Sequence, residues 1–381
     1  MSEIKVNSIK GVGASAAAIT VNNTDGTCTA NITNNLSNRN LIINGAMQVA
    51  QRGTSSTSAG YQTVDRFNVS WYNTDQVALT QSQSTDAPPD FSKSFKVDVT
   101  TAETTLDANE YSWIRYALEA QDCQQLNYNS SNAKSVTLSF WVKSYQTGDF
   151  AVNLNKYPDG SNRSITSTYT VNQSATWEKK TITFVGDTAG GGIDDNADMG
   201  ISIYFFLAAG TDFKGSSANT NQWADYTSAG WANGQAVNLF SSTDNYLQIT
   251  GVQLEVGSVA TDFEHRSYQD EFLRCCRYFY FTNAQHFSVG RGNNSDGFVG
   301  WIELQVPLRA SPSVTLTGGL RQYGIDSYSD STTAPTIPSF RANQKGIRIN
   351  QTGHSGVNDD CVLTVQTNGS DGQGLAFDAE L

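Results

Sequence analysis

Alternation of apolar and polar residues is the clearest pattern in this chain, and it is the pattern of a β-strand. Residues 136–144 read V-T-L-S-F-W-V-K-S. Successive side chains of a strand point to opposite faces, so we expect a strand here. One face would carry Val136, Leu138, Phe140 and Val142, and the other Thr137, Ser139, Trp141 and Lys143.

Several more runs of this kind follow along the chain. The run F-A-V-N-L-N at 150–155 comes after a Gly148–Asp149 turn, which predicts a hairpin with the preceding strand. Gly, Asn and Asp separate the runs and leave little room for crossover helices, so we expect an all-β sandwich or jelly roll. Further strands are expected at 167–171, 180–185 and 200–207, and as a pair at 246–249 and 252–256.

One helix interrupts the strands. Ser267 is followed three residues later by Asp270, close to a capping box, and apolar residues then recur at helical spacing up to about Phe281. We expect a jelly-roll sandwich over 41–266, then this linking helix and a smaller C-terminal β-domain over 267–381. The strands expected in the last part are 298–306, 313–317, 346–350, 361–365 and 375–377.

The first 40 residues carry only short strand-like pieces, I-K-V at 4–6 and I-T-V at 19–21. Pieces of this length cannot form a core alone. We therefore expect segment 1–40 to pair with neighbouring copies of the chain or with a docking partner. The alternative is a frayed tail.

Composition and charge narrow the class of protein. The 381 residues have 16% charged and 11% aromatic side chains, which indicates a folded chain with uncharged polar surfaces. The net charge is −12, and the region 41–270 holds 24 acidic against 13 basic residues. No Lys and Arg cluster is present, so neither nucleic acid nor an anionic membrane is an expected partner. No apolar stretch is long enough to cross a bilayer.

The cysteines argue against a disulfide framework. They are odd in number and two are adjacent, which fits synthesis in a reducing cytoplasm with cysteines buried as small apolar side chains. The five are Cys28, Cys123, Cys275, Cys276 and Cys361.

Sequence motifs for catalysis are missing. There is no G-x-S-x-G, no P-loop and no histidine pair with zinc-ligand spacing. His265 lies in the run Glu264–His265–Arg266, which we interpret as a polar cluster at a domain junction. We therefore expect a protein that is not an enzyme. A polysaccharide depolymerase that uses paired carboxylates is the remaining enzymatic alternative.

One acidic loop offers hard oxygen ligands at short spacing, as calcium prefers. It contains Asp194, Asp195, Asn196 and Asp198. No Glu closes a twelve-residue loop, so this is not an EF-hand. The alternatives are a calcium site and a set of solvated turn residues. No other cofactor is expected.

Aromatic residues in Asn-, Ser- and Gly-rich surroundings are the better functional lead. Sugar rings stack on exposed aromatic side chains, while amides and carboxylates bind their hydroxyls. The alternative is that these aromatics belong to the core or to a subunit interface. The candidate glycan-binding residues are Trp71, Tyr72, Trp223, Tyr226 and Trp231.

Two segments late in the chain resemble a signature that recurs in bacteriophage tail-fibre proteins. They are G-V-Q-L-E-V-G-S-V-A-T-D-F-E-H-R-S at 251–267 and L-R-C-C-R-Y-F-Y at 273–280. In such proteins the signature closes a carbohydrate-binding-module-like sandwich. The run V-P-L-R-A-S-P-S-V-T at 306–315 resembles the domain that follows it.

Earlier segments agree with this resemblance in their order. N-L-I-I-N-G-A-M-Q-V-A-Q-R-G at 40–53 and V-D-R-F at 64–67 resemble the start of the same module, and 136–144 resembles its central strand. The opening M-S-E-I-K-V-N is similar to the start of fibre proteins of marine and cyanobacterial phages. The resemblance covers most of the chain.

The resemblance implies a homotrimeric structural subunit of a tail fibre, located in the virion and made in the host cytoplasm. Its N-terminus would attach to tail adaptor or nozzle proteins, and it would adhere to a host-surface glycan. The alternative is a purely structural virion component, such as a head fibre, decoration or adaptor protein, that binds no receptor.

Overall fold

The computed structural model describes most of the chain. The described residues are 8–9, 19–21, 24, 28–30, 38–157, 160, 162–282, 288–292, 297–318, 320–323, 328–332, 335–337, 346–352, 362–367 and 374–381. Within the first 40 residues, β1 (Ser8–Ile9), β2 (Ile19–Val21) and β3 (Cys28–Ala30) form a small antiparallel sheet in the order β1-β2-β3. The strand expected at 4–6, and with it most of the predicted attachment segment, lies outside the described residues.

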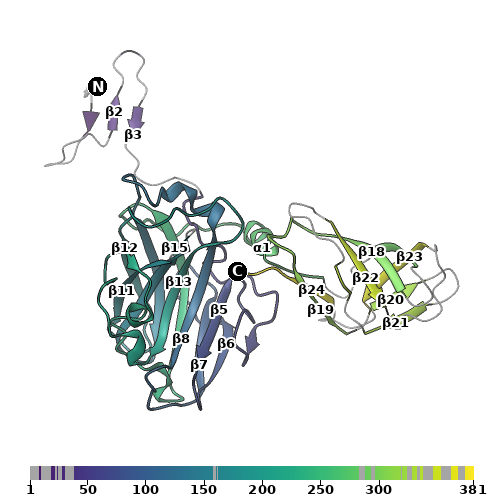
Figure 1. Ribbon diagram of the computed structural model, residues 1–381, viewed down its shortest axis with the longest axis horizontal. Helices are drawn as coiled ribbons and strands as arrows, with labels where there is room; N and C mark the ends of the chain where they lie inside the picture. Colours follow the sequence, from purple (N-terminus) through teal and green to yellow (C-terminus); the bar gives the residue numbers. More distant parts are fainter. Residues whose placement is uncertain are drawn as a thin grey trace, which may run out of the picture.

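The centre of the chain is a sandwich of two six-stranded sheets (Figure 1). We call them the β8 sheet and the β9 sheet. The β8 sheet runs β14 (Ala224–Asp225), β11 (Arg163–Val171), β10 (Gly148–Lys156), β13 (Met199–Ala209), β8 (Tyr111–Glu119), β5 (Phe67–Tyr72). The β9 sheet runs β12 (Glu178–Phe184), β9 (Val136–Ser144), β15 (Tyr246–Val256), β7 (Ser94–Thr101), β6 (Ala78–Ser84), β4 (Ser55–Ser56). Short 3₁₀ turns occupy Ala120–Leu126, Thr211–Phe213, Ser228–Gly230 and Leu239–Ser241.

The predicted strand at 136–144 is confirmed with its limits as β9. Its predicted apolar face lies in the main core, where Val136, Leu138, Phe140 and Val142 are at most 1% exposed. On the neighbouring β15, Leu247, Ile249 and Leu254 are also fully buried in this core. The all-β fold class is therefore confirmed.

Two predicted strand pairings are wrong. The strand at 150–155 is part of β10, but β10 pairs with β11 and β13, whereas β9 pairs with β12 and β15. Gly148 and Asp149 are not a hairpin turn but the first residues of β10, and the chain crosses from one sheet to the other just before them, at 145–147. The expected pair 246–249 and 252–256 is one strand, β15, with an irregularity between Thr250 and Gln253.

The predicted helix is present but shorter than expected. Helix α1 (Tyr268–Cys276) begins after Ser267, whose side chain accepts a hydrogen bond from the Asp270 N–H, so the predicted N-cap is confirmed. The helix ends at Cys276, and the apolar residues beyond it form β16 (Phe279–Phe281) instead. Among the described residues, no helix is long and apolar enough to cross a membrane.

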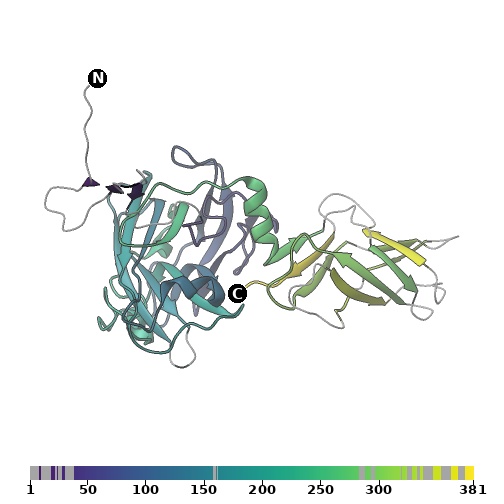
Figure 2. The same cartoon turned by 90° about the horizontal axis from the view of Figure 1, so that it is seen from above.

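The last part of the chain forms two further antiparallel sheets, which lie beyond α1 from the sandwich (Figure 1 and Figure 2). They have their own core, which includes Ile302, Ile349 and Phe377. The first sheet runs β16, β24 (Gly374–Asp378), β19 (Ser313–Thr317). The second runs β21 (Tyr328–Ser331), β20 (Leu320–Tyr323), β23 (Val362–Thr367), β17 (Ser288–Gly292), β18 (Gly297–Glu303), β22 (Gly346–Thr352).

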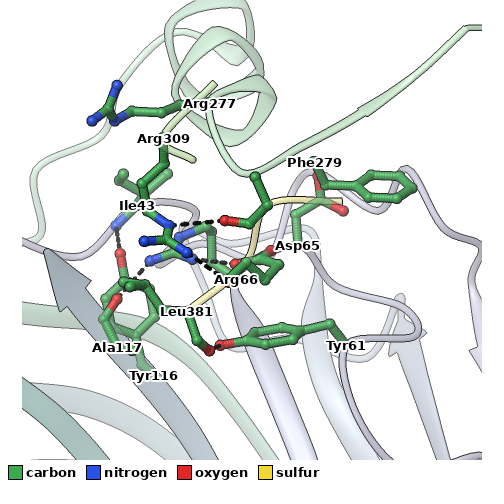
Figure 3. Close-up of polar contacts among 12 residues, drawn as sticks. Ile43, Tyr61, Asp65, Arg66, Tyr116, Ala117, Arg277, Phe279, Arg309 and Leu381 are labelled. Atoms are coloured by element: carbon green, nitrogen blue, oxygen red, sulfur yellow. Dashed lines mark hydrogen bonds and ion pairs between the residues drawn. The ribbon is translucent and has the colours of Figure 1, made fainter. Parts of the chain in front are cut away.

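After β24 the chain returns to the sandwich, where its last residues are held by buried arginines (Figure 3). The side chain of Arg66 is fully buried and forms an ion pair with Glu380, whose side chain is 4% exposed. Its guanidinium also donates to the carbonyl of Ala117 and lies 3.3 Å from the ring centre of Tyr278. Glu380 makes a second ion pair with Arg52 at 3.5 Å.

Two more arginines complete this junction. Arg277, just after α1, pairs with Glu119 of β8 through two hydrogen bonds of 2.7 and 2.8 Å. Arg309 donates to the carbonyls of Ala379 and Glu380 and also to the carbonyl of Ala197 in the sandwich. Because Arg is always charged and offers five donors, it suits such contacts between elements.

We predict that Glu380→Gln lowers the free energy of unfolding by about 3–5 kcal/mol, because it leaves the Arg66 charge buried without its counter-ion. Chemical denaturation of the full chain measures this. Asp378→Asn is the matched control, since Asp378 pairs with Arg52 at 3.0 Å but is 38% exposed, and it should cost about 1 kcal/mol or less. Equal losses in the two variants would contradict the account.

Candidate functional site

Two of the five predicted glycan-binding aromatics pack against the sandwich core. Trp71 is an inward residue of β5, between the outward Ser70 and Tyr72, and packs against the main core. Trp223 also packs there; its ring meets Tyr128 edge-on at 5.6 Å, and its indole N–H donates to the Val185 carbonyl at 2.7 Å. For these two residues the structure therefore shows a packing role.

The other three predicted aromatics meet on the outer face of the β8 sheet. The ring centre of Trp231 lies 5.9 Å from that of Tyr226 and 5.4 Å from that of Phe206 in β13. Tyr72 stacks on Tyr111, with 4.9 Å between the ring centres. We call this group the outer aromatic cluster. Its members are Tyr72, Tyr111, Trp113, Tyr204, Phe206, Phe213, Tyr226 and Trp231.

Most of the outer aromatic cluster is closed to solvent. Trp231 is 9% exposed, whereas Tyr72 at the rim is 42% exposed. Burial raises the pKa of Tyr226 to about 12, with smaller contributions from the nearby Tyr204 and Tyr111 hydroxyls. The indole N–H groups of Trp113 and Trp231 are buried without a hydrogen-bond partner among the described residues. Tyr72 is thus the member most open to a ligand.

The acidic loop predicted to bind calcium lies between β12 and β13. Asp194, Asp195 and Asp198 are exposed, while Asn196 is half-buried. The Asn196 side chain donates to the Asp198 carboxylate and accepts from the Asp198 N–H, which closes a local turn. The carbonyl of Asp194 accepts a hydrogen bond from Gln124. Calcium binding by this loop stays a prediction.

A pocket of about 400 Å³ lies where the sandwich meets the start of α1. We call it the junction pocket. Three of its lining residues have rings in mutual contact: the ring centres of Phe91 and Phe263 are 5.1 Å apart in an edge-on arrangement, and the His265 ring centre lies 5.3 Å from that of Phe91 and 4.9 Å from that of Phe263. Its remaining lining residues are Ala46, Gln48, Asp90, Ser92, Arg266, Tyr268 and Glu271.

The polar side of the junction pocket is held by ion pairs. Arg266 pairs with Glu264 at 3.1 Å and with Glu271 at 3.2 Å. Burial alone would raise the pKa of Glu264, but the Asn40 N–H and the Arg266 guanidinium hold it below its ordinary value. The ion pair of Glu264 with Arg266 agrees with the predicted polar cluster, whereas His265 between them packs against Phe91 and Phe263 instead. The side chains of Asp90 and Ser92 are exposed at the rim.

The residues of this pocket come from three segments that are far apart in the sequence. They are residues 46–48, the 90–92 loop between β6 and β7, and residues 263–271 before and within α1. No local pattern joins these segments, so the sequence did not identify the pocket. The one available signal was the aromatic pair in F-E-H at 263–265, directly after the charged exit from the sandwich.

Comparisons with known proteins place the chain in no family. No family model matches it, and no curated protein matches it. Among solved structures, it is similar to the enzymatically active domain of tailspike protein 4 of bacteriophage CBA120, with a TM-score of 0.30 and 12% identity over 57% of this chain. The match spans only 21% of that tailspike chain.

Two carbohydrate-binding modules show the same degree of similarity. The family 11 module of a cellulosomal cellulase of Clostridium thermocellum has a TM-score of 0.28 and 12% identity, over 56% of this chain and 98% of that one. The tandem family 22 modules of a Paenibacillus barcinonensis protein have a TM-score of 0.29 and 8% identity, over 90% and 96% of the two chains. Similarities this low carry no conclusion about function.

We predict that Gly251→Ala disturbs the junction pocket. Gly251 has φ +60°, and an added Cβ would lie 2.6 Å from Cζ of Phe91 and 3.1 Å from the Trp141 ring. Strain and displacement of Phe91 should cost about 1–3 kcal/mol of stability and change the near-UV circular dichroism. Gly192→Ala is the control, because its Cβ meets nothing within 4 Å. A Gly251→Ala protein with wild-type stability would contradict this geometry.

Proposed function

We propose that this chain is a structural subunit of a bacteriophage tail fibre that adheres to a host-surface glycan through the junction pocket. The observation that carries the binding part is the pocket itself, whose lining combines three rings in mutual contact with charged and amide groups. The fibre setting is supported by the resemblance of segments 251–267 and 273–280 to a tail-fibre signature, and the first of these segments supplies Phe263 and His265.

The chemistry of the junction pocket suits a sugar ring. Binding sites for small molecules commonly occupy about 300–1,000 Å³, and this pocket lies within that range at about 400 Å³. The C–H face of a pyranose would lie against Phe91 and Phe263. Its hydroxyls would meet the side chains of Gln48 and Asp90, which offer both donors and acceptors.

Weak single sites are sufficient for such a role if the fibre is a homotrimer, as we propose from the resemblance. Three pockets per fibre, and several fibres per particle, would raise the overall avidity without a tight single contact. Segment 1–40 would attach the fibre to tail adaptor or nozzle proteins. Light scattering on the full chain gives the oligomeric state directly.

We predict that a His265→Ala/Tyr268→Ala variant loses adsorption to host cells by about tenfold or more, which corresponds to about 1.4 kcal/mol of lost binding. Both residues line the junction pocket, and Tyr268 is 61% exposed, so the fold should remain intact. Tyr145→Ala is the matched control, because Tyr145 is 46% exposed and does not line the pocket. Pull-down with fluorescently labelled protein measures adsorption.

The other outcomes separate the remaining hypotheses. If Tyr72→Ala abolishes adsorption and the pocket variant does not, the glycan binds at the outer aromatic cluster. If wild-type protein adsorbs to no host fraction, a purely structural role in the virion replaces the proposal. Release of reducing sugar from host polysaccharide would instead identify a depolymerase.

A further inference from the structure

Three carboxylates lie close together on the sandwich, outside the loop at 194–198 in which the sequence predicted a calcium site. Carboxylate oxygens of Asp75, Asp107 and Glu110 all lie within 4.8 Å of one another. Asp75 belongs to the loop between β5 and β6, and the other two belong to the connection between β7 and β8. Asp75 and Asp107 are exposed, whereas Glu110 is 1% exposed.

A fourth carboxylate, that of Glu103, interacts with the buried Glu110 of this group. Glu103 is 7% exposed, and its Oε2 is buried with no hydrogen-bond partner among the described residues. Burial is the main cause that raises the pKa of Glu110. The hydrogen bond from the Asp107 N–H lowers this pKa, and the neighbouring Glu103 carboxylate raises it. Within the described part of the chain, no ion pair joins Lys or Arg to any of these carboxylates.

The backbone around the group is fixed in place. Glu110 Oε2 accepts from the Asp107 N–H at 2.6 Å, and Asn73 donates to the Asn109 carbonyl at 2.9 Å, which ties the two loops together. Gly210 packs against the same turn so closely that a Cβ there would lie 2.1 Å from the Asp107 carbonyl oxygen. The fold therefore holds the backbone segments that carry Asp75, Asp107 and Glu110 next to one another.

We propose that this group binds one calcium ion, and we call it the acidic corner. Its members are Asp75, Glu103, Asp107 and Glu110. Calcium binds carboxylate oxygens at about 2.3–2.6 Å, so two ligands on opposite sides of one ion are about 4.8 Å apart, and the observed spacing fits within that limit.

Calcium is the cation that fits this donor set. Zinc sites in proteins are built mainly from His and Cys ligands, and the group has neither. Magnesium keeps most of its waters and uses one or two carboxylates, whereas calcium accepts several carboxylates in flexible geometry. The ion would supply the positive charge that the buried Glu103 and Glu110 carboxylates lack. It would also fix the loops next to Tyr72 and Tyr111 at the rim of the outer aromatic cluster.

The test uses the full chain after removal of divalent ions with EDTA. Calcium added at about 1 mM, the upper end of the range for extracellular calcium modules, should raise the Tm by several degrees. Terbium should bind and luminesce when the nearby Tyr72 and Tyr111 are excited. Asp75→Asn and Asp107→Asn change exposed side chains, so these variants should fold normally and bind calcium at least tenfold more weakly.

Two further variants make the result decisive. Glu103→Gln should raise the Tm of the calcium-free protein, because it removes a buried like charge, and should abolish the rise with calcium. Asp194→Asn/Asp195→Asn, in the exposed loop, should leave the calcium response unchanged. The proposal is overturned if calcium has no effect on Tm and calorimetry detects no binding, if magnesium acts equally well, or if the Asp194/Asp195 variant alone loses the response.

Discussion

The ion pair between Arg66 and Glu380 is the most buried of the described ion pairs that join the last part of the chain to the sandwich. Arg66 is fully buried in the sandwich, and Glu380 reaches it only after the chain has passed through α1 and two further sheets. A buried pair of this kind contributes little net stability, but it is costly to break. It therefore specifies where the C-terminal sheets lie more than it strengthens them. The junction pocket lies near the start of α1, on the segment that this arrangement holds in place.

How far the fold could be predicted depended on whether the deciding contacts were local. The limits of β9 and the Ser267 cap followed from residues at most nine positions apart, and both are confirmed. The partners of β10 depend on which sheet the chain enters after β9 ends at Ser144, and no pattern in residues 145–147 predicts it. The helix prediction ran past Cys276 because apolar residues that serve β16 happen to continue the helical spacing.

The candidate sites show the same limit. Composition drew attention to aromatic residues, but a strand exposes or buries its aromatics according to its register in the sandwich. Tyr72 faces outward and is exposed, while its neighbour Trp71 faces the core. The carboxylates of the acidic corner are 35 positions apart at their extremes, so only the fold brings Asp75 beside Glu110. The junction pocket joins segments even farther apart.

The central claim is that a host glycan binds where the sandwich meets α1. The most direct test is an experimental structure of the full chain with oligosaccharides released from the host surface. The account predicts a sugar ring against Phe91 and Phe263, with hydroxyls at Gln48 and Asp90. Sugar bound elsewhere on the chain, or a junction pocket that holds none at saturating oligosaccharide, would contradict it.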